Sequence, residues 1–197
     1  MSELSLISIQ EPSTLNIDEK EVKRYLKIHK FDTQNDSLIE ECKKEIYKAA
    51  RPRCVYAREC ICVSEGKVDF CFDNVESKNL SKNLSQCTEA YVFCATLGIE
   101  VDRLIQKYAK IEPSKSVVID SVATTLIESF CDYVNGILAE KNELCPRFSA
   151  GYGDYSIKHQ KMILDRLDTS RKIGVSLLES YMMTPSKTVS AIIGIKG

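Results

Sequence analysis

The 197-residue chain lacks the features that mark several common functional classes. Its 27 Lys and Arg residues are balanced by 28 Asp and Glu residues, so it has no broad basic field of the kind that nucleic-acid-binding domains use. No apolar leader follows Met1, and no apolar segment approaches the roughly 20 residues that a membrane-spanning helix needs. We therefore expect a soluble, cytoplasmic protein without a nucleic-acid or membrane partner.

Residues for familiar catalytic chemistry are also scarce. His29 and His159 are the only histidines, and neither has an acidic residue or a cysteine at metal-ligand spacing. The sequence contains no Ser/His/Asp or Cys/His set, no Walker loop and no GxGxxG motif. We expect both histidines to be structural or exposed, and we predict no catalytic residue and no metal site.

The nine cysteines do not have the spacing of zinc ligands, because Cys54, Cys60, Cys62 and Cys71 form no Cys-x2-4-Cys pair. Without a leader, the compartment is expected to be reducing. Most cysteines lie in apolar runs such as residues 91–95, where cysteine behaves as a small hydrophobic residue. Core packing is the favoured interpretation, and a thiol-based redox protein is a remote alternative.

The spacing of apolar residues predicts helices in several parts of the chain. Residues 1–15 show no sustained period and indicate an arm or an edge strand. The expected helices begin near Asp18 and Asp36, include residues 77–86 and 101–108, and begin again near Ser116 and Ser156. The second ends before Arg51-Pro52 and the last at Gly174.

The helix near Ser116 is the longest and carries two distinct faces. Its main apolar face is expected to consist of Val118, Val122, Leu126 and Tyr133. A neighbouring face carries Ser121, Thr124, Glu128 and Cys131.

Alternating apolar residues predict the strands, which are residues 55–63, 68–72, 91–96, 176–183 and 188–195. The first two are joined by a turn at Glu65-Gly66 and form a hairpin. Helices and strands follow one another in mixed order, with hairpin connections available. The sequence therefore predicts an α+β fold in which helices pack around a largely antiparallel twisted sheet.

Two short motifs indicate where chemistry is located. Residues 147–154 read RFSAGYGD, which places a fixed cation, two glycines and an aromatic residue in one loop. Glycine allows tight dihedral angles and close approach of the backbone to a ligand. One helix-length later, residues 179–185 read ESYMMTP.

Together the two motifs resemble the activation domain of cobalamin-dependent methionine synthase, which binds S-adenosylmethionine (AdoMet) through an Arg-x-x-x-Gly-Tyr loop. Thr96-Leu97-Gly98 and the helix around Glu128 extend the resemblance over residues 85–195. It implies that residues 85–197 form the activation-domain core with the AdoMet loop. Residues 1–84, with helices and a hairpin, belong to the same domain.

The resemblance also implies roles for individual residues. Glu128 accepts hydrogen bonds from an AdoMet hydroxyl, Arg147 holds AdoMet, and Ser149 and Gly151 offer backbone groups. Tyr152 faces the corrin ring or the methyl group. From the residues alone, Glu128 is equally well a solvated helix charge, and Tyr152 a core aromatic residue under the loop.

The function implied is that of a free-standing activation subunit, which supports reductive remethylation of cob(II)alamin. Cobalamin is carried by the partner, a corrinoid-bearing methionine synthase without its own activation domain, and a flavodoxin-like or other donor supplies the electron. The alternative is a docking or scaffolding module for a corrinoid methyltransferase that does not itself use AdoMet. Three departures from the family pattern favour that alternative. Ala150 and Gly153 stand where family members usually have prolines on either side of the Gly-Tyr pair. The sequence also ends at Gly197, before the position of a tyrosine that larger family members place near AdoMet.

Overall fold

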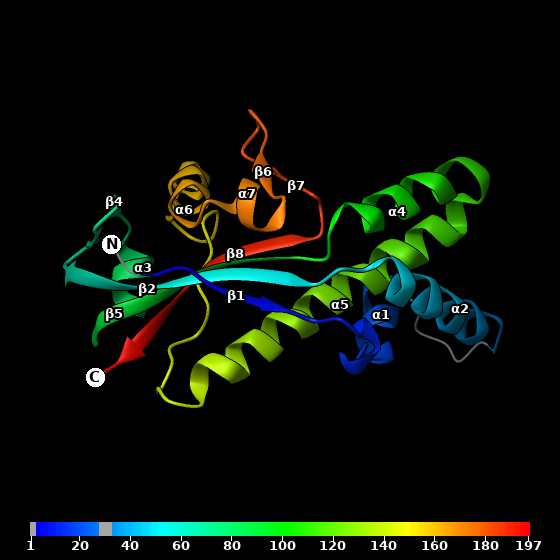
Figure 1. Ribbon diagram of the computed structural model, residues 1–197, viewed down its shortest axis with the longest axis horizontal. Coiled ribbons are helices and arrows are strands. Elements are labelled where there is room, and N and C mark those ends of the chain that lie inside the picture. Colours follow the sequence, from blue (N-terminus) through cyan, green and yellow to red (C-terminus); the bar gives the residue numbers. More distant parts are fainter. Residues whose placement is uncertain (1–2, 28–32) are drawn as a thin grey trace.

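The computed structural model describes residues 3–27 and 33–197, and of residues 33–35 it describes the backbone alone. His29, which the sequence places in the first helix, lies outside the described residues. Within the described ranges the protein has the predicted α+β fold, with helices on both faces of a curved sheet (Figure 1).

Every strand pair of the sheet is antiparallel. The strands of the main sheet are β1 (Ser5–Ser8), β2 (Arg53–Ser64), β3 (Lys67–Phe70), β4 (Asp73–Glu76), β5 (Cys87–Thr96) and β8 (Thr188–Lys196). Their order is β4-β3-β2-β5-β8, and β1 pairs with the start of β2. The sheet thus joins strands from the first and second halves of the chain, and β8 forms its outer strand on one side.

The predicted hairpin is present as β2 and β3, but the sequence analysis missed β4. Of the four residues of β4, Val75 alone is buried, so the strand has no apolar alternation that a sequence pattern could detect. The polar residues Asp73 and Asn74 instead indicate a turn.

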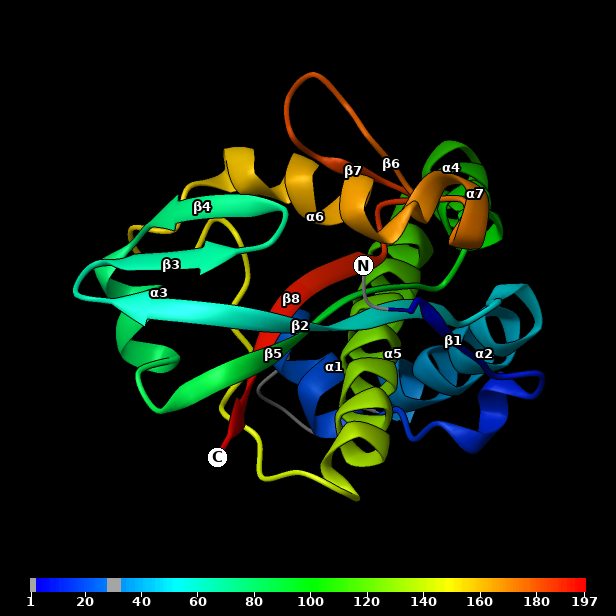
Figure 2. The ribbon, with the colours of Figure 1, turned by 60° about the vertical axis from the view of Figure 1, so that its left-hand side comes forward.

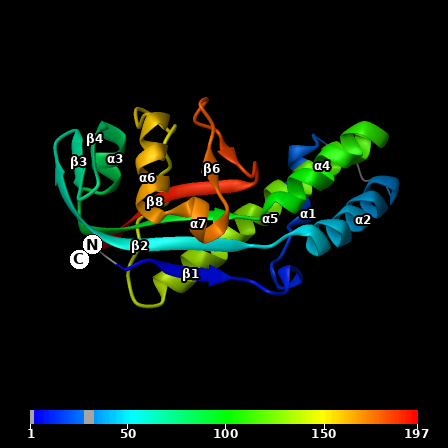
Figure 3. The same cartoon turned by 45° about the horizontal axis from the view of Figure 1, so that its top comes forward.

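Helices cover the two faces of the sheet differently. They are α1 (Glu19–Tyr25), α2 (Thr33–Ala49), α3 (Lys78–Asn83), α4 (Ile99–Ile111), α5 (Pro113–Ala139), α6 (Gln160–Leu167) and α7 (Thr169–Ile173), with short 3-10 turns at Pro12–Thr14 and Ile157–His159. Helix α5 crosses one face, whereas α6 and α7 cover the other (Figures 1 and 2). Helices α1, α2 and α4 gather around the beginning of α5 (Figure 3).

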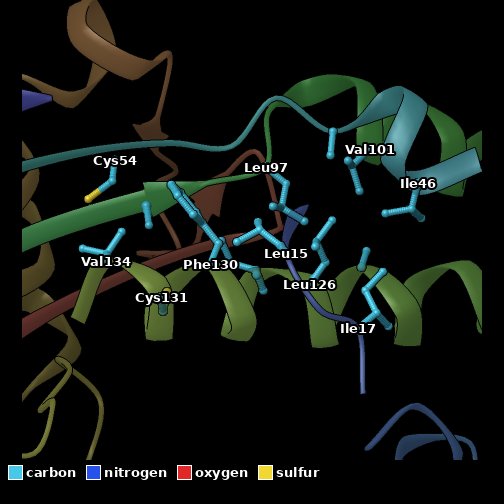
Figure 4. Packing of buried hydrophobic residues seen from close by; sticks show 14 of the residues in the cluster. Leu15, Ile17, Ile46, Cys54, Leu97, Val101, Leu126, Phe130, Cys131 and Val134 are labelled. Atoms are coloured by element: carbon cyan, nitrogen blue, oxygen red, sulfur yellow. The ribbon is translucent and has the colours of Figure 1, made fainter. Parts of the chain in front are cut away.

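Helix α5 changes its packing partners along its length. Near its start it packs on α2 and α4, and further along it packs on β5 and β8. Phe130 and Val134 belong to the cluster that also contains Cys54 and Leu97 (Figure 4). Tyr133, predicted on the apolar face, is 48% exposed. That prediction was wrong because the buried side of α5 rotates around the helix when the partner changes from helices to sheet.

The predicted strand 176–183 is also wrong. The structure has two short strands, β6 (Ser176–Leu177) and β7 (Met183–Thr184), which pair with each other as a small hairpin. Tyr181 has a φ of +62°, which a regular strand cannot include. The exposed residues Leu178 and Met182 lie in the connecting loop.

All nine cysteines are free, and six of them are buried, as core packing predicts. Burial raises the pKa of Cys131 to about 12. Cys60, Cys62 and Cys71 are exposed, because they lie on the solvent-facing side of β2 and in the turn after β3. In residues 3–27 and 33–197 no group of His, Cys, Asp or Glu is arranged to hold a metal ion, and no helix is long and apolar enough to cross a bilayer.

Candidate functional site

The Arg147 loop starts from the outer edge of β8. After α5 the chain returns along this strand, where Leu144 bridges Ile195. Phe148 and Ile192 then exchange two backbone hydrogen bonds, both 2.9 Å long. Arg147 is therefore held at the outer edge of β8 by the residue that follows it.

Two glycines turn the chain in the loop itself. Gly151 has a φ of +96° and Gly153 a φ of +56°, a region in which side-chain-bearing residues are strained. The Gly151 N–H donates to the Tyr155 carbonyl over 2.8 Å, and Tyr155 is 1% exposed. The turn is thus closed by backbone bonds and fixed by a buried aromatic residue beneath it.

Asp154 ties the loop to the start of α3. Its carboxylate accepts hydrogen bonds from the Ser77 hydroxyl, from the Lys78 N–H at 2.8 Å and from the Asn79 N–H at 3.1 Å. The bond from Ser77 contributes most to holding the pKa of Asp154 below its ordinary value. This anchor was not identified from the sequence, because its partners lie more than 70 residues away along the chain.

The position of Gly153 explains why proline is not found there. Proline requires a φ near −65°, whereas Gly153 has a positive φ. A Cβ atom at this position would also lie 2.1 Å from Asn79 Nδ2. Glycine therefore allows both the turn and the close approach to α3.

The Arg147 guanidinium reaches across to α5. Its Nη2 atom lies 3.0 Å from Asp132 Oδ1 and 3.3 Å from Glu128 Oε2. The Arg147 side chain is 24% exposed, against 49% for Glu128 and 72% for Asp132. Glu128 is therefore more than an isolated surface charge. Asp132 was missed from the sequence, although it follows Glu128 by one helical turn and so shares its face.

A cavity of about 490 Å³ opens beside this ion pair. Its walls consist of Glu128, Arg147, Phe148, Ser149, Ala150, Tyr152, Gln160, Met183, Thr188, Val189 and Ser190. Four of the five predicted site residues are among them. Gly151 is not, and its role is the turn that brings Tyr152 to the rim, where Tyr152 is 68% exposed and thus no core aromatic residue.

Two buried polar atoms in the cavity wall have no hydrogen-bond partner in the described part of the chain. They are Arg147 Nη1 and Ser190 Oγ. Buried donors and acceptors are almost always satisfied in folded proteins, so unpaired ones indicate a missing water, ion or ligand. Both residues line this cavity, which makes it the candidate site for a polar ligand.

Gln160 connects the cavity wall to the second motif, residues 179–185. Gln160 is 5% exposed, and its side-chain amide donates to the Tyr181 carbonyl over 3.0 Å. This bond connects α6 to the β6–β7 hairpin, from which Met183 enters the cavity. Gln160 was not predicted, because its partner is 21 residues away in the sequence.

His159 lies beneath the loop and outside the cavity. Its Nδ1 atom is 2.7 Å from Asp73 Oδ2, and its ring packs on Tyr155 with centroids 5.5 Å apart. His159 is structural, as the sequence analysis expected.

A second cavity, of about 560 Å³, lies among α6, α7 and the hairpin, and Glu179 and Tyr181 line it. None of its lining side chains has a buried polar atom that lacks a partner. It therefore carries a weaker indication of ligand binding than the Arg147 cavity.

Comparison with known proteins places this geometry in a known architecture. No protein-family model matches the sequence, and no curated protein matches it. A solved structure described as the crystal structure of the MetH reactivation domain bound to AdoHcy (S-adenosylhomocysteine) aligns with a TM-score of 0.77 and 15% identity. The alignment covers 98% of this chain and 78% of that one. The chain therefore has the fold of the methionine synthase reactivation domain, as its two motifs predict.

Proposed function

We propose that this protein binds AdoMet in the Arg147 cavity and serves as a separate reactivation subunit for a cobalamin-dependent methionine synthase. The observation that carries the proposal is the Arg147 guanidinium in the wall of this cavity, beside the Glu128 carboxylate. A guanidinium binds a carboxylate through two parallel hydrogen bonds, and AdoMet carries a carboxylate at its amino-acid end.

The residues present fit such a ligand. The cavity volume of about 490 Å³ lies in the range of small-molecule sites, roughly 300–1,000 Å³. Glu128, on the same side as Arg147, accepts hydrogen bonds from ribose hydroxyls. The structural neighbour is described as bound to AdoHcy, which has the amino-acid, ribose and adenine groups of AdoMet.

The task of these side chains is positioning. Bound AdoMet would supply the methyl group of its sulfonium for the reduced cobalt of the partner's cobalamin. Arg147 and Glu128 orient the ligand, and the exposed ring of Tyr152 at the rim faces the incoming corrin or the methyl group. No proton moves at the methyl group, so orientation and exclusion of water dominate the contribution of the protein.

The partners in this proposal are a corrinoid-bearing methionine synthase without its own reactivation domain and a flavodoxin-like or other electron donor. A cytoplasmic location follows from the same proposal. The fold supports this assignment, because almost the whole chain aligns with a reactivation domain.

Reconstitution tests the function. The protein is added, with reductant and AdoMet, to an oxidised cobalamin-dependent methionine synthase from which the reactivation domain has been removed. Restored turnover with the wild-type protein and little restoration with Arg147→Ala are expected. Unchanged turnover with and without the wild-type protein would reject the proposal.

One observation favours the docking or scaffolding alternative. Glu128 and Asp132 already neutralise Arg147 in this structure, so the guanidinium is charge-balanced without a ligand. A docking module would restore or change methyltransferase behaviour without binding AdoHcy. Direct titration with AdoHcy therefore separates the two functions.

A further inference from the structure

The outer edge of β8 presents unpaired backbone groups at Ser190. Phe148 exchanges hydrogen bonds with Ile192 on this edge, so the N–H and C=O of Ile192 point outward. On the inner edge, Leu97 donates to the Lys187 carbonyl, so Lys187 and every second residue after it face β5. Because backbone direction alternates along an antiparallel strand, the N–H and C=O of Ser190 also point outward.

No segment pairs with this part of the edge. The chain turns away from β8 at Ser149, directly after the Phe148 bridge. Within residues 3–27 and 33–197 no backbone hydrogen bond covers the outward side of Ser190. Ser190 is nonetheless 2% exposed, and its hydroxyl has no partner. This one residue of the cavity wall thus has a donor, an acceptor and a hydroxyl without a hydrogen-bond partner in the described part of the chain, an arrangement that costs free energy unless water or a ligand satisfies it.

The cavity has a charged half and a neutral half. Arg147 and Glu128 form the charged half, on the side of the sheet that α5 covers. The Ser190 side chain lies on the opposite face of the sheet. Side chains alternate along β8, so Ser190 is on the face opposite Ala191 and on the same face as Ile192. Ile192 packs in the core that also contains residues of α6 and α7, whereas Ala191 packs in the core with α5. Its neighbours in the cavity wall, Ala150, Gln160 and Met183, carry no charge.

We propose, on the basis of AdoMet binding in this cavity, that Ser190 recognises the adenine ring. Adenine presents an acceptor, N1, beside a donor, the N6 amino group. The Ser190 N–H donates to N1, the Ser190 carbonyl accepts from N6, and the hydroxyl forms a further bond to the base. Met183 supplies apolar surface for the ring. The charged amino-acid end then lies at Arg147, so the two halves of the cavity define the direction of the ligand.

Two ligands and two variants test this orientation. AdoHcy has both ends, whereas 5′-methylthioadenosine keeps adenine and ribose and lacks the amino-acid end. Ser190→Ala is expected to weaken both ligands by the same factor, about 3- to 10-fold, the effect of one lost hydrogen bond. Arg147→Ala is expected to weaken AdoHcy alone. If Ser190→Ala weakened AdoHcy but left 5′-methylthioadenosine unchanged, Ser190 would hold the amino-acid end and the proposal would be overturned.

A third ligand makes the test independent of the variants. S-inosylhomocysteine reverses the donor and acceptor of the base and should bind the unmodified protein at least tenfold more weakly than AdoHcy, because the Ser190 groups are then left unpaired. Equal affinity would overturn the adenine assignment even if Ser190→Ala did not fold. Absence of binding by any adenosine ligand would reject AdoMet binding together with this inference, whereas binding with the wrong pattern would reject the inference alone.

Discussion

Arg147 Nη2 lies 3.0 Å from Asp132 Oδ1, and Asp132 follows Glu128 by one turn of α5. Two carboxylates thus contact one guanidinium. They differ in their position relative to the cavity, because Glu128 lines it and Asp132 does not. A ligand carboxylate that binds Arg147 competes with Asp132, while Glu128 remains available to the ligand. The two acidic residues are therefore expected to affect ligand binding in opposite directions.

Glu128→Gln and Asp132→Asn form a matched pair for this expectation. Glu128→Gln should weaken AdoMet and AdoHcy alike, because both carry the same ribose. Asp132→Asn should strengthen AdoHcy binding by up to about fivefold, since an ion pair this exposed is worth less than about 1 kcal/mol. Calorimetric titrations of the folded variants measure both effects. Unchanged affinity in Glu128→Gln for both ligands would remove Glu128 from the site.

Arg147→Ala should weaken AdoMet binding by about 1.5–3 kcal/mol, the usual range for a hydrogen bond to a charged group. Arg147→Lys should recover only part of this loss, because an ammonium does not offer the two parallel donors of a guanidinium. Binding curves and thermal unfolding are measured together. An alanine variant with normal affinity and a much lower Tm would show that Arg147 is a structural residue.

Gly153→Ala should destabilise the protein by about 1–2 kcal/mol, because a side chain is strained at a φ of +56°. The matched control is Gly136→Ala in α5, where nothing lies within 4 Å of an added Cβ. That variant should be stabilised by roughly 0.5–1 kcal/mol. Urea unfolding gives both values. Equal stability changes in the two variants would contradict the described turn.

Asp154→Asn should loosen the loop above about pH 4, and its effect should diminish progressively as the pH falls below that value. The pKa of Asp154 is lowered in the folded protein, so its contribution is fully present above the unfolded-state value, near 3.9, and is lost as the pH falls through the lower folded-state value. The difference in Tm between wild type and variant should therefore shrink on acidification. A difference that stayed constant from pH 6 to pH 3 would show that the Asp154 charge does not anchor the loop.

The sequence was sufficient for those parts of the site that lie within one short segment. Residues 147–154 already contain the cation, glycines and aromatic residue of the loop, and helical spacing placed Glu128 on the helix face beside the main apolar one. Asp154 and Ser77 are 77 residues apart, so their contact depends on how α3 meets the loop. Ser190 looks like any small strand residue until the Phe148 bridge shows which way its backbone points.

The same distinction holds for the fold. Local periodicity predicted the long helices and the hairpin, because each buries a regular stripe of apolar residues. Tyr133 was misplaced because its exposure depends on which element α5 packs against at that point. The strand predicted at 176–183 failed because the exposed Leu178 and Met182 were read as part of an apolar alternation, whereas Tyr181 turns the chain between them.

Titration of the purified wild-type protein with AdoHcy, beside Arg147→Ala under the same conditions, tests the central claim most directly. The site predicts saturable binding of one AdoHcy per chain to the wild type, with clear loss of affinity in a variant that remains folded. Absence of saturable binding by the folded wild-type protein, or equal binding by the two proteins, would contradict the assignment of the Arg147 cavity as an AdoMet site.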